Sequence, residues 1–275
     1  MIGKPAQPVG YYLREWRRHR RMSQLDFALE AEISQRHLSF MESGRSTPSR
    51  EMVHHLAERL DIPLRERNVL FLAAGYAPMF PERAIDDPAL KPAREAIDLV
   101  LGGHEPFPAL AVDRHWTLVA ANKAVAPLLG GVTEASLLEP PVNVLRLALH
   151  PGGLAPHTAN LPEWRAHLLE RLRHQIWVTS DPVLSQLMAE LSAYPDQAAT
   201  PVRRLAPQQR DYAGVVVPLE LVTEAGLLSF FSTITVFGTP IDITLSELAL
   251  EAFFPANAET TTTLRQLAAH RTASG

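Results

Sequence analysis

Apolar side chains recur with two different periods along this chain of 275 residues. Over the first 75 residues they return every three or four positions, which is the spacing that gives a helix one apolar face. Beyond about residue 105, the helical period is mixed with short apolar runs and with a period of two, which is typical of strands. The change of period predicts a helical first domain and a mixed second domain.

Five short helices are predicted in the first domain, and two of them are joined by a tight turn. The first helix of this pair begins at Ser23, a good N-cap, and places Leu25, Ala28 and Leu29 on one apolar face. The turn between the two helices is Glu32-Ile33. The other helices of the predicted 1–76 bundle span 9–22, 50–60 and 64–74.

The second helix of the pair has outward positions that make it a candidate for binding DNA. Ser34 caps it, Leu38 and Met41 are its predicted buried residues, and Gly44 ends it in the left-handed conformation. Burial of Leu38 and Met41 turns outward a set of polar, cationic and aromatic side chains: Gln35, Arg36, Ser39 and Phe40. A short helix, a tight turn and a second helix with polar residues near its start form a helix-turn-helix.

A proline-rich stretch over 77–92 separates the two predicted domains and is expected to be stiff. The second domain, 93–275, then mixes helices and strands in an α+β order. Two strands flank Asp113-Arg114, and three more follow after several helices. We expect a five-stranded antiparallel sheet with covering helices on one face. The predicted strands span 109–112, 116–120, 215–222, 227–237 and 245–254, and the main helices span 163–178, 182–191 and 258–270.

Composition and charge narrow the possible functions. The chain has no cysteine, which excludes disulfides, thiol catalysis and cysteine zinc sites. No apolar run approaches the roughly 18 residues of a membrane-spanning helix, and we expect a cytoplasmic protein with no membrane partner. Residues 1–75 hold 12 Lys and Arg against 9 Asp and Glu, whereas the remainder holds 14 against 21. This asymmetry favours nucleic-acid binding by the first domain alone.

The first helix adds a group of five arginines just before the helix-turn-helix. We expect at least some of them to contact DNA phosphates, because such contacts dominate the affinity of DNA-binding proteins. The group consists of Arg14, Arg17, Arg18, Arg20 and Arg21.

Residues 23–49 follow the order S-Q-x-x-x-A-x-x-A-x-I-S-x-x-x-L-S-x-x-E-x-G-R-x-x-P-S, which resembles the Xre/Cro type of helix-turn-helix. The resemblance covers about the first 75 residues and implies binding to double-stranded DNA. One departure is Glu32, which stands where that family usually has Gly. A positive φ is unfavourable for a non-Gly residue, so we expect a wider turn. The alternative is a small bundle that binds a protein or nothing.

The same resemblance assigns roles to individual side chains of the candidate DNA-binding surface. Gln24 and Arg45 are expected to contact phosphates or the groove. Gln35, Arg36 and Phe40 are expected to face the bases, with Ser34 and Ser39 beside them. Because one short recognition helix covers few base pairs, we also expect a homodimer that binds two half-sites.

Three segments of the second domain resemble the sensor half of MmyB-like regulators, which join an Xre helix-turn-helix to a PAS-like ligand-binding domain. The segments are HWTLVAANKAVAPLL, NVLRLALHPGGL and LSELALEAFFPAN. The resemblance implies a transcription regulator that responds to a small apolar ligand, and we expect a fatty acid. The alternatives are a second domain that only dimerises or docks a protein partner, and an enzyme fused to a DNA-binding domain.

A carboxylate inside an apolar cavity needs cationic or amide donors. The candidates are Asn122, Arg146 and His150, which combine polar groups with apolar surroundings. Arg146 interrupts the apolar run 144–149, although it is also placed to pair with an acidic neighbour such as Glu139. The candidate cavity walls are Trp116, Leu118, Phe230, Phe231 and Phe237.

Sequence signals of catalysis or of a cofactor are weak. There is no GxSxG and no Gly-rich phosphate loop. His167 and His174 share a helix face and could bind a metal as a pair, but Arg171 lies between them on that face. We therefore expect no enzymatic activity, no metal and no cofactor beyond a bound ligand.

Overall fold

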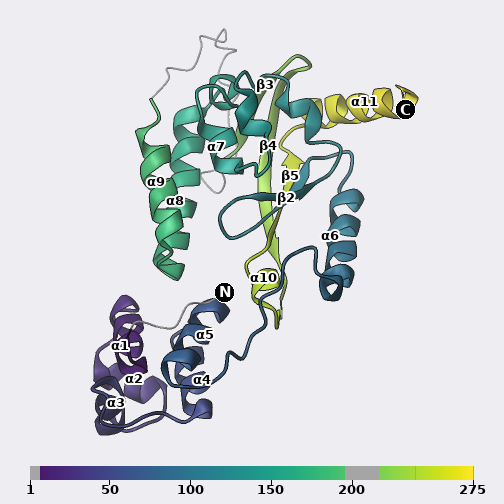
Figure 1. The fold of residues 1–275 in the computed structure, drawn as a ribbon. Coiled ribbons are helices and arrows are strands. Elements are labelled where there is room, and N and C mark those ends of the chain that lie inside the picture. The colour runs from purple at the N-terminus through teal and green to yellow at the C-terminus, as the bar shows by residue number, and fades with distance from the viewer. Residues whose placement is uncertain (1–6, 196–216, 239, 275) are drawn as a thin grey trace. The chain divides into compact units, whose positions relative to one another are not determined.

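The computed structural model describes residues 7–195, 217–238 and 240–274. The chain divides into two compact units (Figure 1). The first consists of residues 1–83 together with 239–246, and the second consists of residues 84–238 and 247–275. The first unit therefore takes in a short segment that lies, along the chain, between two strands of the second.

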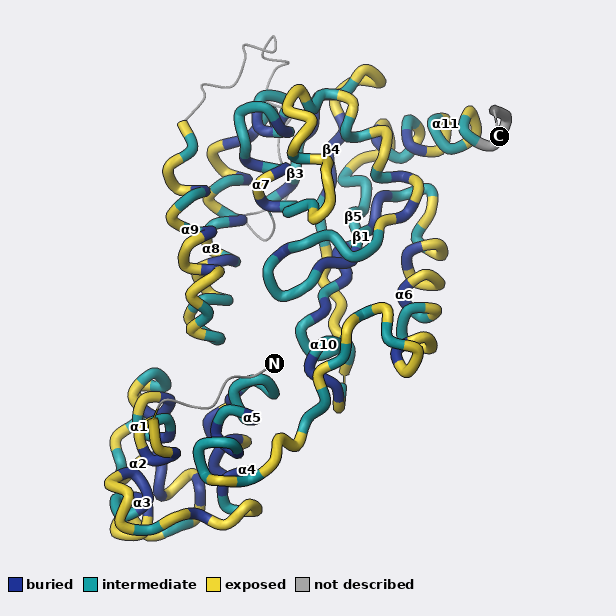
Figure 2. Tube along the Cα trace, viewed as in Figure 1, coloured by how far each residue is buried: buried dark blue, intermediate teal, exposed yellow. Residues whose placement is uncertain are grey.

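The first unit contains the five predicted helices. They are α1 (Val9–His19), α2 (Gln24–Glu30), α3 (Gln35–Glu42), α4 (Arg50–Arg59) and α5 (Leu64–Ala73), and the segment 239–246 adds the single turn α10 (Ile243–Ser246). Ser23, Ser34 and Ser49 each cap a helix by accepting a hydrogen bond from a backbone N–H three residues later. Buried side chains from all five helices form one core. Each of these helices has buried positions, drawn in dark blue in Figure 2.

The predicted apolar face of α2 is partly wrong. Ala28 is buried as expected, but Leu25 and Leu29 are 53% and 69% exposed. Phe27, which was not assigned to the core, is fully buried instead. Burial of the Phe27 ring removes more apolar surface from water than burial of a leucine side chain would. The buried face of α2 therefore consists of Phe27 and Ala28, together with Ala31 at the end of the helix.

The turn between α2 and α3 does not widen to accommodate Glu32, so that prediction is wrong. Glu32 adopts φ of 53°, the left-handed conformation that Gly would supply. The backbone N–H of Ile33 donates to the carbonyl of Ala28, and that of Glu32 donates to Leu29. These two bonds form a Schellman motif, which satisfies the carbonyls at the end of α2.

The second unit contains a five-stranded antiparallel sheet with the order β2-β1-β5-β4-β3, which confirms the predicted sheet. The strands are β1 (Ala109–Val112), β2 (Leu118–Ala121), β3 (Leu219–Thr223), β4 (Gly226–Val236) and β5 (Ala249–Pro255). The ends of four strands differ from the prediction by one to four residues, and in two places the local structure is of another kind. Trp116 lies in the turn before β2 with φ of 65°, and residues 243–246 form α10 instead of the start of β5. Residues 215 and 216 lie outside the described residues.

Helices contact both faces of this sheet, whereas the sequence predicted one covered face. The side chains of α7, α8 and α9 form one core with Leu110 and Val112 of β1. Those of α6 pack against Ala109 and Ala111, which point to the opposite face. The helices are α6 (Lys91–Gly103), α7 (Val144–Leu149), α8 (Leu161–Thr179), α9 (Pro182–Ala193) and α11 (Ala258–Ser274), and 3₁₀ turns lie at 88–90, 126–129, 135–138 and 155–157.

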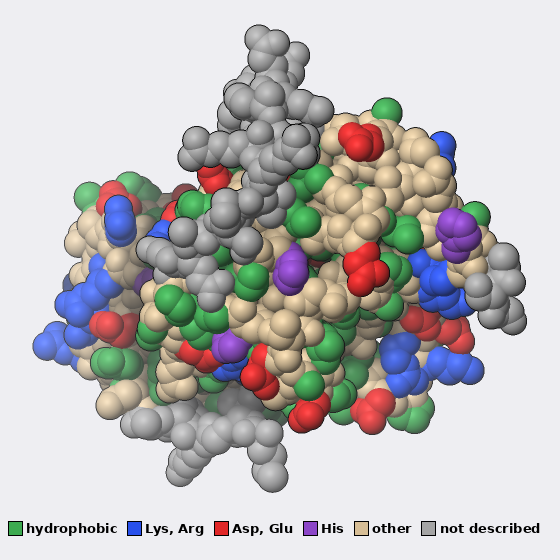
Figure 3. All heavy atoms as spheres, turned by 90° about the horizontal axis from the view of Figure 1, so that it is seen from above, with side chains coloured by type: hydrophobic (Ala, Val, Ile, Leu, Met, Phe, Trp, Pro, Cys, Tyr) green, Lys and Arg blue, Asp and Glu red, His purple; other side chains and the backbone are tan. Residues whose placement is uncertain are grey.

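On the face shown in Figure 3, hydrophobic side chains lie in small groups among charged side chains of both signs. Among the helices of the described ranges, none is long and apolar enough to cross a membrane.

Candidate functional site

The outer surface of α3 carries most of the candidate DNA-binding side chains. Ser34 accepts a hydrogen bond from the backbone N–H of His37 at 3.1 Å and fixes the start of the helix. Gln35 and Arg36 are exposed, and Ser39 and Phe40 are half-buried. The predicted outward face of α3 is therefore the face that the fold leaves accessible.

The Phe40 ring contacts two cationic side chains on this surface. The Arg36 guanidinium carbon lies 5.2 Å from the centre of the Phe40 ring, and that of Arg45 lies 5.8 Å from it. Contacts of this kind between a guanidinium and an aromatic ring are attractive. Arg45 follows the Gly44 turn, so two separate elements present positive charge beside one ring.

Glu42 is the buried acid that holds the helix-turn-helix against α1. Its carboxylate accepts two hydrogen bonds from Arg17, at 2.6 and 2.9 Å, and one from the Gln24 amide at 2.8 Å. Burial alone would raise the pKa of Glu42, but the bonds from Arg17 and Gln24 outweigh it and lower the pKa below its ordinary value. The side chain therefore stays ionised at neutral pH.

This network changes the interpretation of the α1 arginines. Arg17 is only 8% exposed and its guanidinium is hydrogen-bonded to Glu42, so Arg17 is not among the arginines available to a phosphate. Arg20 donates to the carbonyls of Leu60 and Asp61. Arg18 is exposed and remains a candidate for phosphate contact. Gln24, the other predicted phosphate contact, is half-buried and donates to Glu42.

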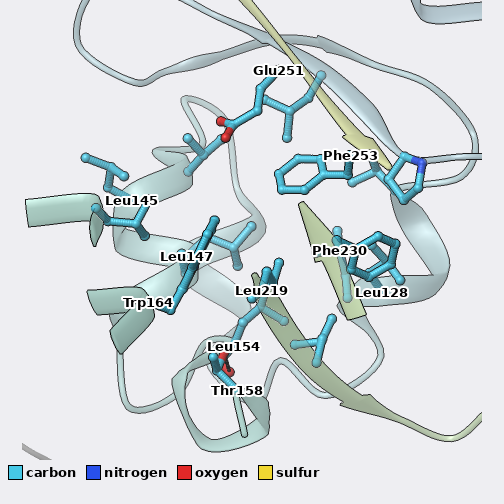
Figure 4. Close-up of a pocket in the computed structure, with 18 of the residues that line it drawn as sticks. Leu128, Leu145, Leu147, Leu154, Thr158, Trp164, Leu219, Phe230, Glu251 and Phe253 are labelled. Carbon is cyan, nitrogen blue, oxygen red and sulfur yellow. Dashed lines mark hydrogen bonds between the residues drawn. The ribbon is translucent and has the colours of Figure 1, made fainter. Parts of the chain in front are cut away.

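The second unit encloses a cavity of about 110 Å³ whose walls are almost entirely hydrocarbon (Figure 4). Its walls come from α7, α8, the four strands β1, β3, β4 and β5, and the loops between these elements. Trp164 and Leu168 enter from α8, and Phe230 and Phe253 enter from β4 and β5. Further walls are Leu110, Leu128, Leu145, Leu147, Leu154 and Leu219.

The predicted polar anchors do not meet at this cavity. Arg146 lies on the surface in a two-bond ion pair with Glu190, at 2.7 and 2.8 Å, instead of with Glu139. His150 accepts a hydrogen bond from the backbone N–H of Gly152. Asn122 is buried beside β1. Its oxygen accepts from Ala109 and Ala124, and its amide donates to Leu101 and Phe107. These residues brace the fold, and none of the three lines the cavity.

Two of the predicted cavity walls are in place. Trp116 lines the cavity, and its indole N–H donates to Gln175 at 2.8 Å. Phe230 is fully buried and also lines the cavity. Leu118, Phe231 and Phe237 do not line it. Phe231 stacks on Phe254 instead, with ring centres 5.4 Å apart.

Glu251, the charged side chain of the cavity wall among the described residues, is not one of the predicted site residues. Glu251 lies on β5 and is 5% exposed. It accepts a hydrogen bond from Arg171 of α8 at 2.9 Å. The Arg171 guanidinium also lies 4.8 Å from the Trp116 ring centre. The available signal was a single acid inside the apolar run of residues 248–254.

A second, more open cavity of about 740 Å³ shares Trp116 and Glu251 with the first. Arg171, His167 and His174 line it, so the three side chains that share a face of α8 do point into one space. Burial, together with the nearby Arg171 charge, lowers the pKa of His167 below its ordinary value. His167 is therefore neutral at pH 7.

A helix-turn-helix joined to a unit with an apolar cavity defines a DNA-binding transcription regulator with a ligand-binding domain. Comparison with protein families agrees: a helix-turn-helix model matches residues 13–67, and the MmyB-like transcription regulator ligand binding domain matches residues 93–267. The chain belongs to the MmyB-like family. Among curated proteins, none matches the sequence.

Proposed function

We propose that the protein acts as a homodimer whose PAS-like second domain binds a straight-chain apolar ligand and thereby changes the affinity of the first domain for DNA. Fatty acids are the first ligand class to test. The observation that carries the proposal is the cavity of the second unit, because most of its walls are leucine, valine and aromatic side chains, with Thr158 and Glu251 as the polar exceptions. Such walls suit a hydrocarbon chain and offer few groups to a polar molecule.

The apolar walls of the cavity favour binding of the hydrocarbon chain of a fatty acid. Burial of each methylene contributes about 0.8 kcal/mol, so affinity should rise with chain length until the space is filled. Arg146 is paired with Glu190 at the surface and does not line the cavity, so the proposal gives it no role in holding the polar end.

The proposal of a homodimer rests on the size of α3. Its eight residues span about two turns and reach only a few base pairs. Two copies on half-sites about 34 Å apart would supply the missing sequence specificity.

A thermal-shift series tests the proposal on the full chain after removal of any co-purified lipid. Saturated fatty acids and straight-chain alcohols from six to fourteen carbons should raise the melting temperature progressively, because binding to the folded state stabilises it. Native mass spectrometry should show the bound molecule in the same samples.

A variant that fills the cavity provides the control. Ala148 lines the cavity, so Ala148→Phe should abolish the stabilisation. Ala166→Phe, at an exposed position of α8, should leave it unchanged. A melting temperature independent of chain length in the wild type would refute ligand binding and favour a second domain that only docks a partner.

A further inference from the structure

The two outer strands of the sheet have their free edges covered by loops of the same unit. Beside β2, the backbone N–H of Leu118 donates to the carbonyl of Val142. Beside β3, the backbone N–H of Ala159 donates to the carbonyl of Glu220. An uncovered edge presents unpaired N–H and C=O groups to which another chain can bond, and folded proteins usually cover or protect such edges.

The second half of β4 differs from these covered edges. β4 has 11 residues, but β3 pairs only with residues 226–230 of it (Figure 1). Residues 231–236, here called the edge segment, pair with β5 on one side. Among the described residues, no strand pairs with the other side of the edge segment. Since a strand rises about 3.4 Å per residue, the segment extends over about 20 Å and is long enough to bind a second strand.

The edge segment lacks the features that protect exposed strands from pairing. Its sequence is FSTITV, which contains no charged residue, proline or glycine. Its register with β5 advances one residue at a time, without a bulge that would bend the strand away. Thr233 and Thr235 are exposed, and Ile234 and Val236 are 49% and 60% exposed. Exposed β-branched side chains on a regular, uncharged strand favour pairing with another strand.

A second copy of this chain suits the edge segment, because the segment is complementary to itself. A two-fold axis through Ile234, perpendicular to the sheet, would pair two copies of the segment antiparallel. Thr233 of one copy would then lie opposite Thr235 of the other, and threonine pairs of this kind stabilise a sheet. Because the segment carries no charge, two copies meet without repulsion, whereas a different protein would find no charge to recognise.

We propose that residues 231–236 of β4 form the dimer interface of the second unit, by antiparallel pairing with the same residues of a second copy into one continuous sheet. The inference rests on the homodimer of the proposed function and assigns the surface through which its two copies bind each other. Along the chain, this interface is closely followed by the segment 239–246, which belongs to the DNA-binding unit.

Two variants of opposite charge test the interface in the full-length protein. Thr233→Lys with Thr235→Lys places like charges opposite each other, so the dimer dissociation constant from sedimentation equilibrium should rise at least about tenfold. Thr233→Glu with Thr235→Glu should have the same effect. An equimolar mixture of the two should form a heterodimer, because each lysine then faces a glutamate. Recovery of the dimer also shows that both variants are folded.

A matched control places the same charges elsewhere on the second unit. Thr262 and Gln266 are exposed on α11 and do not belong to the sheet. Thr262→Lys with Gln266→Lys should therefore leave the dimer dissociation constant unchanged.

A cysteine scan locates the two-fold axis, since the natural chain contains no cysteine. Single substitutions from Ser232→Cys to Thr235→Cys are oxidised, and the yield of disulfide-linked dimers is measured for each. A residue on the axis lies beside its own copy, so the yield should peak at one position, which is Ile234→Cys for an axis through Ile234. Thr262→Cys, on α11, gives the background yield.

The outcomes separate this inference from the proposed function. Three results would overturn the β4 interface and leave the homodimer intact: a wild-type dimer that both charge variants retain, dissociation that the mixture does not reverse, or cysteine yields no higher than the background. A wild-type protein that stays monomeric both free and on its selected DNA would refute the homodimer, and this inference would fail with it.

Discussion

At the scale of single residues, Glu42 shows how much of the helix-turn-helix depends on one buried charge. Three donors from α1 and α2 converge on its carboxylate. Glu42→Gln should destabilise the first unit by about 3 kcal/mol, because it leaves the Arg17 guanidinium buried without a counter-charge. Glu30→Gln, on the exposed surface of the same unit, should have little effect. Hydrogen exchange of the first-unit amides measures both, and equal protection in the two variants would contradict the assignment.

The same residue predicts an acid sensitivity of the first unit. The pKa of Glu42 is lower in the folded than in the unfolded chain. Its contribution is therefore complete above the unfolded-state value of about 4.3 and is lost as the pH falls through the folded-state pKa. The protection of first-unit amides should decrease over this range in the wild type. Glu42→Gln should lack this component of the pH dependence.

Glu32 carries backbone strain that the wild-type sequence tolerates. Its φ of 53° is unfavourable for a residue with a Cβ by about 1 kcal/mol or more. Glu32→Gly should therefore stabilise the first unit by up to about 1 kcal/mol, less the greater unfolded-state entropy of glycine. Glu30→Gly, at the last helical residue of α2, should instead destabilise it. Hydrogen exchange decides between these signs, and destabilisation by both changes would refute the strain.

At the scale of elements, α3 is the part of the chain that should set sequence specificity. Arg36 is exposed and held beside Phe40, which suits a side chain that contacts a base edge. Arg36→Ala should relax the preference at one position of each half-site, at a cost of about 1–3 kcal/mol. Selection from a randomised DNA library measures the preference. Arg59→Ala, on α4, is the control, and an Arg36→Ala profile identical to the wild type would remove Arg36 from the base contacts.

The elements also show what the sequence could and could not reveal. The five helices and the antiparallel sheet follow from periodicity and from caps such as Ser23 and Ser34, which are local signals. The sequence wrongly predicts Leu25, instead of Phe27, on the buried face of α2. A helix of seven residues makes only two turns, and so short a pattern does not distinguish these two apolar positions. The Glu251–Arg171 pair joins residues 80 positions apart, which no local pattern encodes.

At the scale of the whole molecule, the chain itself connects the cavity to the first unit. β4 and β5 contribute Phe230 and Glu251 to the cavity, and the segment between these strands belongs to the first unit. Within that unit, Asp242 forms an ion pair with Arg83 at 2.7 Å, and Ile243 donates to the carbonyl of Pro81. Pro81 and Arg83 lie in the proline-rich stretch that the sequence predicts to be stiff.

This connection predicts a variant that separates binding from response. Asp242→Asn removes the ion pair with Arg83, and Asp242 does not line the cavity. It should keep the ligand's affinity and reduce the effect of the ligand on DNA binding. Thermal shift and DNA titration measure the two quantities separately, and an unchanged effect on DNA would exclude the Asp242 contact from the coupling.

The decisive measurement is the affinity of the full chain for its selected DNA site with and without a saturating chain ligand. In the wild type the ligand should change the affinity by about 5- to 150-fold, which corresponds to a coupling of roughly 1–3 kcal/mol. In Ala148→Phe, whose cavity is filled, the same ligand should change nothing. A wild-type affinity that stays constant while thermal shift proves the ligand bound would contradict a ligand-responsive regulator.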